Sequence, residues 1–86
     1  MSLRNRIGYF RIARAMVDES PELVMAVMAR CVIVDCNLKY IANSFEYWAL
    51  SPDFDEVELG QITPDYSVMV EMINELPVVT FKRISA

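Results

Sequence analysis

Residues 66–84, Tyr-Ser-Val-Met-Val-Glu-Met-Ile-Asn-Glu-Leu-Pro-Val-Val-Thr-Phe-Lys-Arg-Ile, decide the fold of this chain. Apolar and polar side chains alternate on both sides of residues 74–77, which predicts two half-buried strands joined by a four-residue loop. In that register Ile73 faces Val78 and one face of the hairpin is mostly apolar, with the pairs Met72/Val79, Val70/Phe81 and Val68/Arg83. The other face is more polar, with the pairs Glu71/Thr80 and Met69/Lys82. A slip of one residue would turn the apolar set outward, so the pattern predicts an antiparallel sheet with one core face.

Two further strands are predicted upstream of this hairpin. Residues 31–40 alternate, and the prediction places on the core face Val32, Val34, Cys36, Leu38 and Tyr40. The opposite, wet face of that strand carries Asp35, Asn37 and Lys39. Residues 45–50 are rich in aromatic side chains and fit a neighbouring strand that directs Phe45, Tyr47 and Ala49 into the core.

The first part of the chain is predicted to be helical. Apolar residues at spacings of three and four predict an amphipathic helix over residues 3–17, namely Leu3, Ile7, Phe10, Ala13 and Val17. Ser20 suits a helix N-cap and Pro21 suits the first helical position, so a second, largely apolar helix is predicted from residue 21 to about residue 29. The chain is thus predicted to form a single small α+β domain over residues 1–86. Its N-terminal helical segments (1–29) precede a four-stranded antiparallel sheet (30–86).

Composition favours self-association and disfavours a general nucleic-acid binder. The chain has 86 residues, of which 55% are hydrophobic, so some apolar groups should remain outside the core of one subunit. The net charge is −4, and every charged residue before Asp18 is an arginine: Arg4, Arg6, Arg11 and Arg14. An acidic body lacks the positive face that nucleic acid requires, although a basic N-terminal helix leaves polyanion contact through these four arginines as the alternative.

Known catalytic and metal-binding patterns are absent from the sequence. The chain has no histidine, and its two glycines stand apart at positions 8 and 60. These features exclude histidine-dependent hydrolases, most zinc sites and glycine-rich phosphate loops. The acidic residues 53–58 fail the calcium-loop template and are interpreted as a hydrated connector. Asp35 with Glu46 or Glu71 could form a catalytic carboxylate pair only beside a cleft, which the sequence does not imply. We therefore expect a protein that is not an enzyme and that has no cofactor, metal or small-molecule substrate.

The two cysteines indicate a reducing compartment. Cys31 and Cys36 are five residues apart on one predicted strand and face opposite sides, so we expect buried free thiols in a cytoplasmic protein. No secretory signal is visible, and the longest apolar stretch, residues 23–34, contains Arg30 and is too short to cross a bilayer. No membrane association is expected.

Five apolar side chains fall on the predicted wet face of the sheet, which is too many for an idle surface. They are Ile33, Trp48, Leu50, Met69 and Ile73. This set predicts an interface with a second copy of the chain, as a homodimer, or with another protein. Trp48 is its expected anchor, because tryptophan is often energetically central at interfaces.

The segment Phe45-Glu46-Tyr47-Trp48-Ala49-Leu50-Ser51-Pro52-x-Phe54-Asp55-Glu56-Val57-x-x-Gly60-x-Ile62-x-Pro64-x-Tyr66 resembles a pattern in short phage and prophage proteins of unknown function. The resemblance covers about a quarter of the chain and carries no catalytic or binding residue with it. It implies a small accessory protein in the cytoplasm of an infected or lysogenic bacterium, which works by engaging another protein.

Overall fold

The structure, a computed structural model, describes residues 3–58 and 60–84 and has the expected α+β class with a different layout. Its seven elements form two antiparallel sheets and two short helices, where the sequence predicted one four-stranded sheet. The elements in chain order are β1 (Ile7–Ala13), α1 (Arg14–Glu19), α2 (Pro21–Met28), β2 (Val32–Lys39), β3 (Ser44–Leu50), β4 (Tyr66–Ile73) and β5 (Leu76–Arg83).

The predicted helix over residues 3–17 is wrong, because Ile7–Ala13 form strand β1. Gly8, Phe10 and Ile12 alternate toward the interior, and β1 pairs antiparallel with β3 along its whole length, from Ile7 opposite Leu50 to Ala13 opposite Ser44. Only the last part of the predicted segment belongs to a helix, since α1 begins at Arg14. The proposed division into a helical part (1–29) and a β part (30–86) is corrected accordingly.

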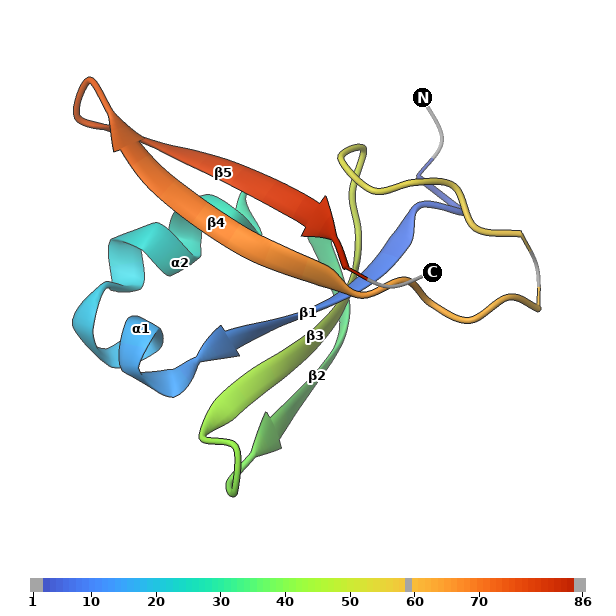
Figure 1. The fold of residues 1–86 in the computed structure, drawn as a ribbon, viewed down its shortest axis with the longest axis horizontal. Coiled ribbons are helices and arrows are strands. Elements are labelled where there is room, and N and C mark those ends of the chain that lie inside the picture. Colours follow the sequence, from blue (N-terminus) through green and yellow to red (C-terminus); the bar gives the residue numbers. More distant parts are fainter. Residues whose placement is uncertain (1–2, 59, 85–86) are drawn as a thin grey trace.

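The second predicted helix is confirmed as α2, with Ser20 at its N-cap and Pro21 at its start. Its apolar surface is only partly buried. Val27 is fully buried, whereas Met25 on another side of the helix is 72% exposed. In Figure 1 α1 and α2 occupy the opening between the two sheets, which diverge from one end of the molecule.

Strands β2 and β3 lie where the sequence predicted strands, but β2 is an edge strand with little burial. The order of the three-stranded sheet is β1-β3-β2, so β3 is central. The pairing of β2 with β3 shifts between Ile33 and Asp35, where a bulge leaves Val34 as the extra residue. The side chains predicted to fill the core from this strand are instead exposed, with Val32 at 55% and Val34 at 52%. Of the predicted set only Leu38 is half-buried.

The terminal hairpin exists with its predicted core face and a different register. Ile73 pairs with Leu76, so the loop has two residues and all pairs are displaced by two positions from the prediction. Asn74 and Glu75 both have positive φ (52° and 67°), as a type I′ turn requires. A displacement by two keeps the faces unchanged, and Val68, Val70, Val79 and Phe81 pack against the core as expected.

A proline interrupts the outer edge of the hairpin at one position. Ile84 N donates to Asp65 O at 2.9 Å, so the backbone groups of Ile84 face β4. Hydrogen-bonded and non-hydrogen-bonded pairs alternate along the ladder, so every second residue of β5 counted back from Arg83 directs its backbone groups away from β4. Pro77, opposite Met72, is one of the residues whose backbone nitrogen faces outward. Because proline has no N–H, this position of the edge offers no donor to another strand.

An aromatic cluster joins the two sheets where they approach one another. The ring centroid of Phe10 lies 5.3 Å from that of Tyr47 and 5.4 Å from that of Phe81. Phe54, from the connector between β3 and β4, stacks on Tyr66 with centroids 4.5 Å apart. At the same end a single parallel bridge, Tyr9 to Asp65, links β1 to the start of β4. The aromatic part of the core lies at this end, Val27 of α2 extends the core between the two sheets, and the distal end of the hairpin projects beyond it (Figure 1).

Candidate interaction surfaces

The acidic connector is bound to arginine side chains, and not merely hydrated as predicted. Arg30 holds Asp53 through two contacts, Nε–Oδ2 at 2.9 Å and Nη2–Oδ1 at 2.7 Å. Arg83 Nη1 lies 3.0 Å from Asp55 Oδ2, and Arg6 Nη2 lies 3.7 Å from Glu56 Oε1. These ion pairs lie on both sides of Phe54, whose ring packs in the core against Phe10, Tyr66 and Phe81.

The four N-terminal arginines do not form one basic face. Arg4 lies in a turn, Arg6 precedes β1, Arg11 is on β1 and Arg14 begins α1. Arg14 Nε lies 3.8 Å from Asp18 Oδ2, and Arg6 also donates to the carbonyl oxygen of Phe54 at 2.8 Å. The prediction that these residues share one helix is wrong, and Glu56 and Asp18 offset the charges of Arg6 and Arg14.

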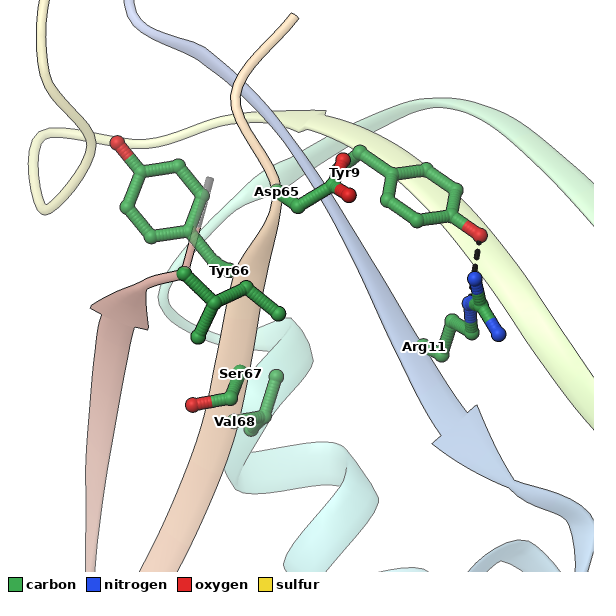
Figure 2. A pocket seen from close by; sticks show the side chains of 7 residues that line it. Tyr9, Arg11, Asp65, Tyr66, Ser67 and Val68 are labelled. Carbon is green, nitrogen blue, oxygen red and sulfur yellow. Dashed lines mark hydrogen bonds between the residues drawn. The ribbon is translucent and has the colours of Figure 1, made fainter. Parts of the chain in front are cut away.

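A cleft of about 480 Å³ opens between β1 and β4, beyond their bridge (Figure 2). It is lined by Tyr9, Arg11, Asp65, Tyr66, Ser67, Val68 and Ile84. A second hollow of about 430 Å³ adjoins it and shares three of these residues, and its other walls include Glu46, Trp48 and Ile62. Of the carboxylates considered as a catalytic pair, only Glu46 lines either space; Asp35 is exposed on β2 and Glu71 belongs to the other sheet.

A chain of polar contacts crosses this region. The Tyr9 hydroxyl donates to the Glu46 carboxylate, Arg11 Nε donates to the Tyr9 oxygen at 2.8 Å, and Lys39 Nζ lies 3.6 Å from Glu46 Oε1. Burial and the bond to Glu46 raise the pKa of Tyr9, and the hydrogen bond from Tyr9 lowers the pKa of Glu46. Both pKa values move away from neutrality, so neither group is tuned for proton transfer near pH 7.

Trp48 and Leu50 lie together, half-buried, on the outer face of the three-stranded sheet. The Trp48 ring is partly covered by Tyr9, whose centroid is 5.1 Å away. Ile33, in contrast, pairs opposite Ala49 and shares the core-side face, because the bulge follows it. The predicted interface therefore does not form one surface, since its two remaining residues, Met69 and Ile73, lie on β4 in the other sheet.

On the hairpin, Met69 and Ile73 gain two neighbours that sequence reasoning missed. In the observed register Leu76 lies opposite Ile73, and Val78 lies opposite Glu71 between the two predicted residues. We call the outer-face set Met69, Ile73, Leu76 and Val78 the hairpin patch; their exposed fractions are 51%, 48%, 67% and 42%. Leu76 was missed because the prediction assigned it to the loop. A two-residue turn would have revealed it.

A second apolar surface follows β2 and the turn after it. Besides Val32 and Val34, it exposes Ile33, Tyr40 at 79% and Ile41 completely. Cys36 is exposed on this strand, in contrast to its predicted burial, and Cys31 is half-buried. Burial raises the pKa of the Cys31 thiol, which disfavours the reactive thiolate. Both cysteines are free.

Comparison with protein-family models, with curated proteins and with solved structures finds no significant match to this chain. Within residues 3–58 and 60–84, no helix has both the length and the apolar character needed to cross a bilayer. The same residues contain no group of three or more His, Cys, Asp or Glu side chains placed to hold a metal ion.

Proposed function

We propose that this protein is a non-enzymatic accessory protein that acts through protein–protein contact, as a homodimer that engages another protein. The observation that carries the proposal is the hairpin patch. Its four large apolar side chains are each at least 42% exposed, and they lie next to one another on two paired strands. Contiguous apolar surface of this kind is typical of contact sites.

The position of the patch also supports the proposal. The hairpin projects from the body of the protein, and its distal end is far from the aromatic cluster that anchors it (Figure 1). Met72, on the inner face near the turn, is 58% exposed as well. The distal end of the hairpin is therefore exposed on both faces and has little stability of its own, so a partner that covers it would stabilise it.

The setting that we propose is the cytoplasm of an infected or lysogenic bacterium, and it rests on the resemblance of residues 45–66 to short phage and prophage proteins. Nucleic-acid association has weaker support, because the basic residues that would mediate it are dispersed and partly paired with acids.

The experiment compares the wild-type chain, Leu76→Lys and the matched control Glu58→Lys as immobilised baits in an extract of the source cell. Bound proteins are identified and quantified by mass spectrometry. We expect a defined protein to be retained by the wild type and the control and to be lost at least roughly tenfold with Leu76→Lys, because a charge within the patch must be desolvated on contact. Equal recovery with all three baits, or no retained protein at all, would contradict contact through the patch.

A further inference from the structure

The backbone edge of β2 that faces away from β3 is available for pairing with another strand. β3 pairs with one side of β2, and no other described strand pairs with the opposite side. The backbone N–H of Cys36 does not join the ladder with β3 but donates to Asp35 Oδ1 at 2.9 Å. Because alternate residues of a strand direct their backbone groups to opposite sides, Leu38 presents its groups on the same outer edge as Cys36. The bulge at Val34 ends this regular alternation.

We propose that two copies of this chain pair antiparallel through β2, in the register centred on Asn37, so that Asp35 of each copy faces Lys39 of the other. The three-stranded sheets of the two copies then form one continuous six-stranded sheet. This inference rests on the proposed function, since it specifies how the homodimer assembles.

Charge complementarity selects the register. Asp35 and Lys39 are the only charged residues of β2. With Asn37 at the two-fold axis, each charge meets a charge of opposite sign. Centring the pair on Asp35 would place two carboxylates directly opposite each other, which is unfavourable. Registers centred on Cys36 or Leu38 would leave both charges opposite uncharged residues.

The apolar side chains fit the same register. Next to the paired residues 35–39, Val34 lies beside Tyr40 of the second copy. In the single chain Val34 is 52% exposed, Tyr40 is 79% exposed and Ile41 is fully exposed. The same pairing therefore covers the part of the second apolar surface around Val34 and Tyr40, which packing within one chain leaves exposed.

The contact between Asp35 and the Cys36 N–H makes the β2 edge selective for a second copy of this chain over unrelated strands. In the single chain the Asp35 carboxylate occupies this outward donor. In the dimer the carboxylate turns to Lys39 of the second copy, and the Cys36 N–H is released to the carbonyl of Leu38 across the axis. A strand without a suitably placed cation would displace the carboxylate without compensation, so unrelated strands are disfavoured.

The test is charge reversal followed by mixing. Sedimentation equilibrium is measured for the wild type, Asp35→Lys, Lys39→Asp, an equimolar mixture of these two variants, and the control Glu58→Lys. We expect a wild-type mass of twice the 9.9 kDa of the chain. Each single reversal should weaken the dimer about tenfold or more, because both symmetric pairs become repulsive. The mixture should recover the dimer, because it pairs a strand with two lysines against a strand with two aspartates.

A cross-linking measurement reports the register itself. In a Cys36→Ser background, Asn37→Cys should form an oxidised dimer, because residues at the axis of a non-hydrogen-bonded pair have Cα atoms about 4.5 Å apart. Asp35→Cys in the same background should not, since the two positions are four residues out of register, or about 13 Å apart.

The outcomes separate this inference from the proposed function. A wild-type dimer that is insensitive to both reversals, or one cross-linked through Asp35→Cys and not through Asn37→Cys, overturns the register and leaves protein contact standing. A chain that stays monomeric overturns the β2 dimer. Contact with another protein is then decided by the capture experiment on the hairpin patch. Failure of the mixture to recover the dimer overturns the charge pairing even when each variant alone is monomeric.

Discussion

Gly8 is the residue on which the packing between the two sheets depends most directly. It is buried on β1 at the point where the connector and β4 cross over the three-stranded sheet. A Cβ atom here would lie 2.8 Å from Phe54 Cδ2 and 2.8 Å from Tyr66 Cε2, well inside van der Waals contact. The missing side chain therefore allows the stacked pair Phe54 and Tyr66 to approach the sheet.

We predict that Gly8→Ala lowers the free energy of unfolding by about 2–3 kcal/mol, because two ring systems must shift. Gly60→Ala is the comparison, since a Cβ there contacts nothing and only the positive φ of 87° causes a cost, about 1 kcal/mol. Urea denaturation measures both. In a double-mutant cycle, Phe54→Leu should cost less in the Gly8→Ala background than in the wild type. Additive effects would contradict the assigned clash.

Glu46 should make stability depend on pH at the acidic end. Its folded pKa lies below the ordinary value of 4.5, chiefly because Tyr9 donates to the carboxylate. The unfolded chain then binds the proton more readily than the folded one. The contribution of Glu46 is present above the ordinary pKa and is lost as the pH falls through the folded pKa.

The measurement compares urea midpoints of the wild type and Glu46→Gln from about pH 6 to about pH 3. We expect the wild type to be the more stable at the upper end and the two midpoints to converge at the lower end. A difference that stays constant over this range would show that the residue acts through packing and not through its charge.

At the scale of elements, the turn of the hairpin has the backbone geometry that sets the register, but its second residue disfavours that geometry. Both central residues adopt positive φ, and Glu75 at 67° has none of the freedom that glycine or asparagine has in this region. The turn sets the register that assembles the hairpin patch, because Leu76 meets Ile73 only across a two-residue loop.

Glu75→Gly should therefore stabilise the protein by about 0.5–1 kcal/mol, since an Asn-Gly pair is the preferred sequence of a type I′ turn. Glu75→Ala is the matched control and should give no such gain, because alanine carries the same Cβ penalty as glutamate. Thermal unfolding measures both variants. Equal effects of glycine and alanine would show that removal of the Glu75 charge, and not the backbone, is responsible.

The elements also show what the sequence can predict. Strong local signals gave correct results: Ser20-Pro21 starts α2, and the alternation in residues 66–83 gives β4 and β5 with the right core face. The prediction for the N-terminal segment was wrong because Gly8, one of the three inward positions of β1, has no side chain and therefore gives no hydrophobic signal in the sequence. Helical spacing of Leu3, Ile7 and Phe10 then dominated the interpretation.

Other features depend on neighbours that a sequence does not name. The alternation of β2 is real, but whether its apolar face is covered depends on its place at the edge of the sheet. The bulge after Ile33 moved this residue to the face opposite Trp48. The interface prediction thus combined residues of two sheets: Trp48 and Leu50 lie together on β3, whereas Met69 and Ile73 lie on the outer face of β4.

At the scale of the whole molecule, stability should be unevenly distributed. The aromatic cluster ties the sheets together at one end, while the distal part of the hairpin, from Glu71 to Val78, is exposed throughout. Regions with few buried apolar contacts open locally at lower free energy than the global transition.

We predict that backbone amides near the turn of the hairpin exchange with deuterium roughly tenfold or more faster than those of the β1–β3 ladder. Hydrogen exchange followed by NMR resolves the two groups in one sample. Protection in the hairpin should rise when the partner captured through the hairpin patch is added. Uniform protection in the free chain would contradict local opening of the hairpin.

Pro77 has a consequence for how far self-assembly can proceed. A subunit that could pair through two different sheet edges would add further subunits without limit and grow into a filament. Here Pro77 removes one outward donor from the edge formed by β5, which makes that edge a poorer partner for an added strand. Pairing through β2 is symmetric, so the β2 edges of two chains occupy each other and this contact cannot extend to a third chain.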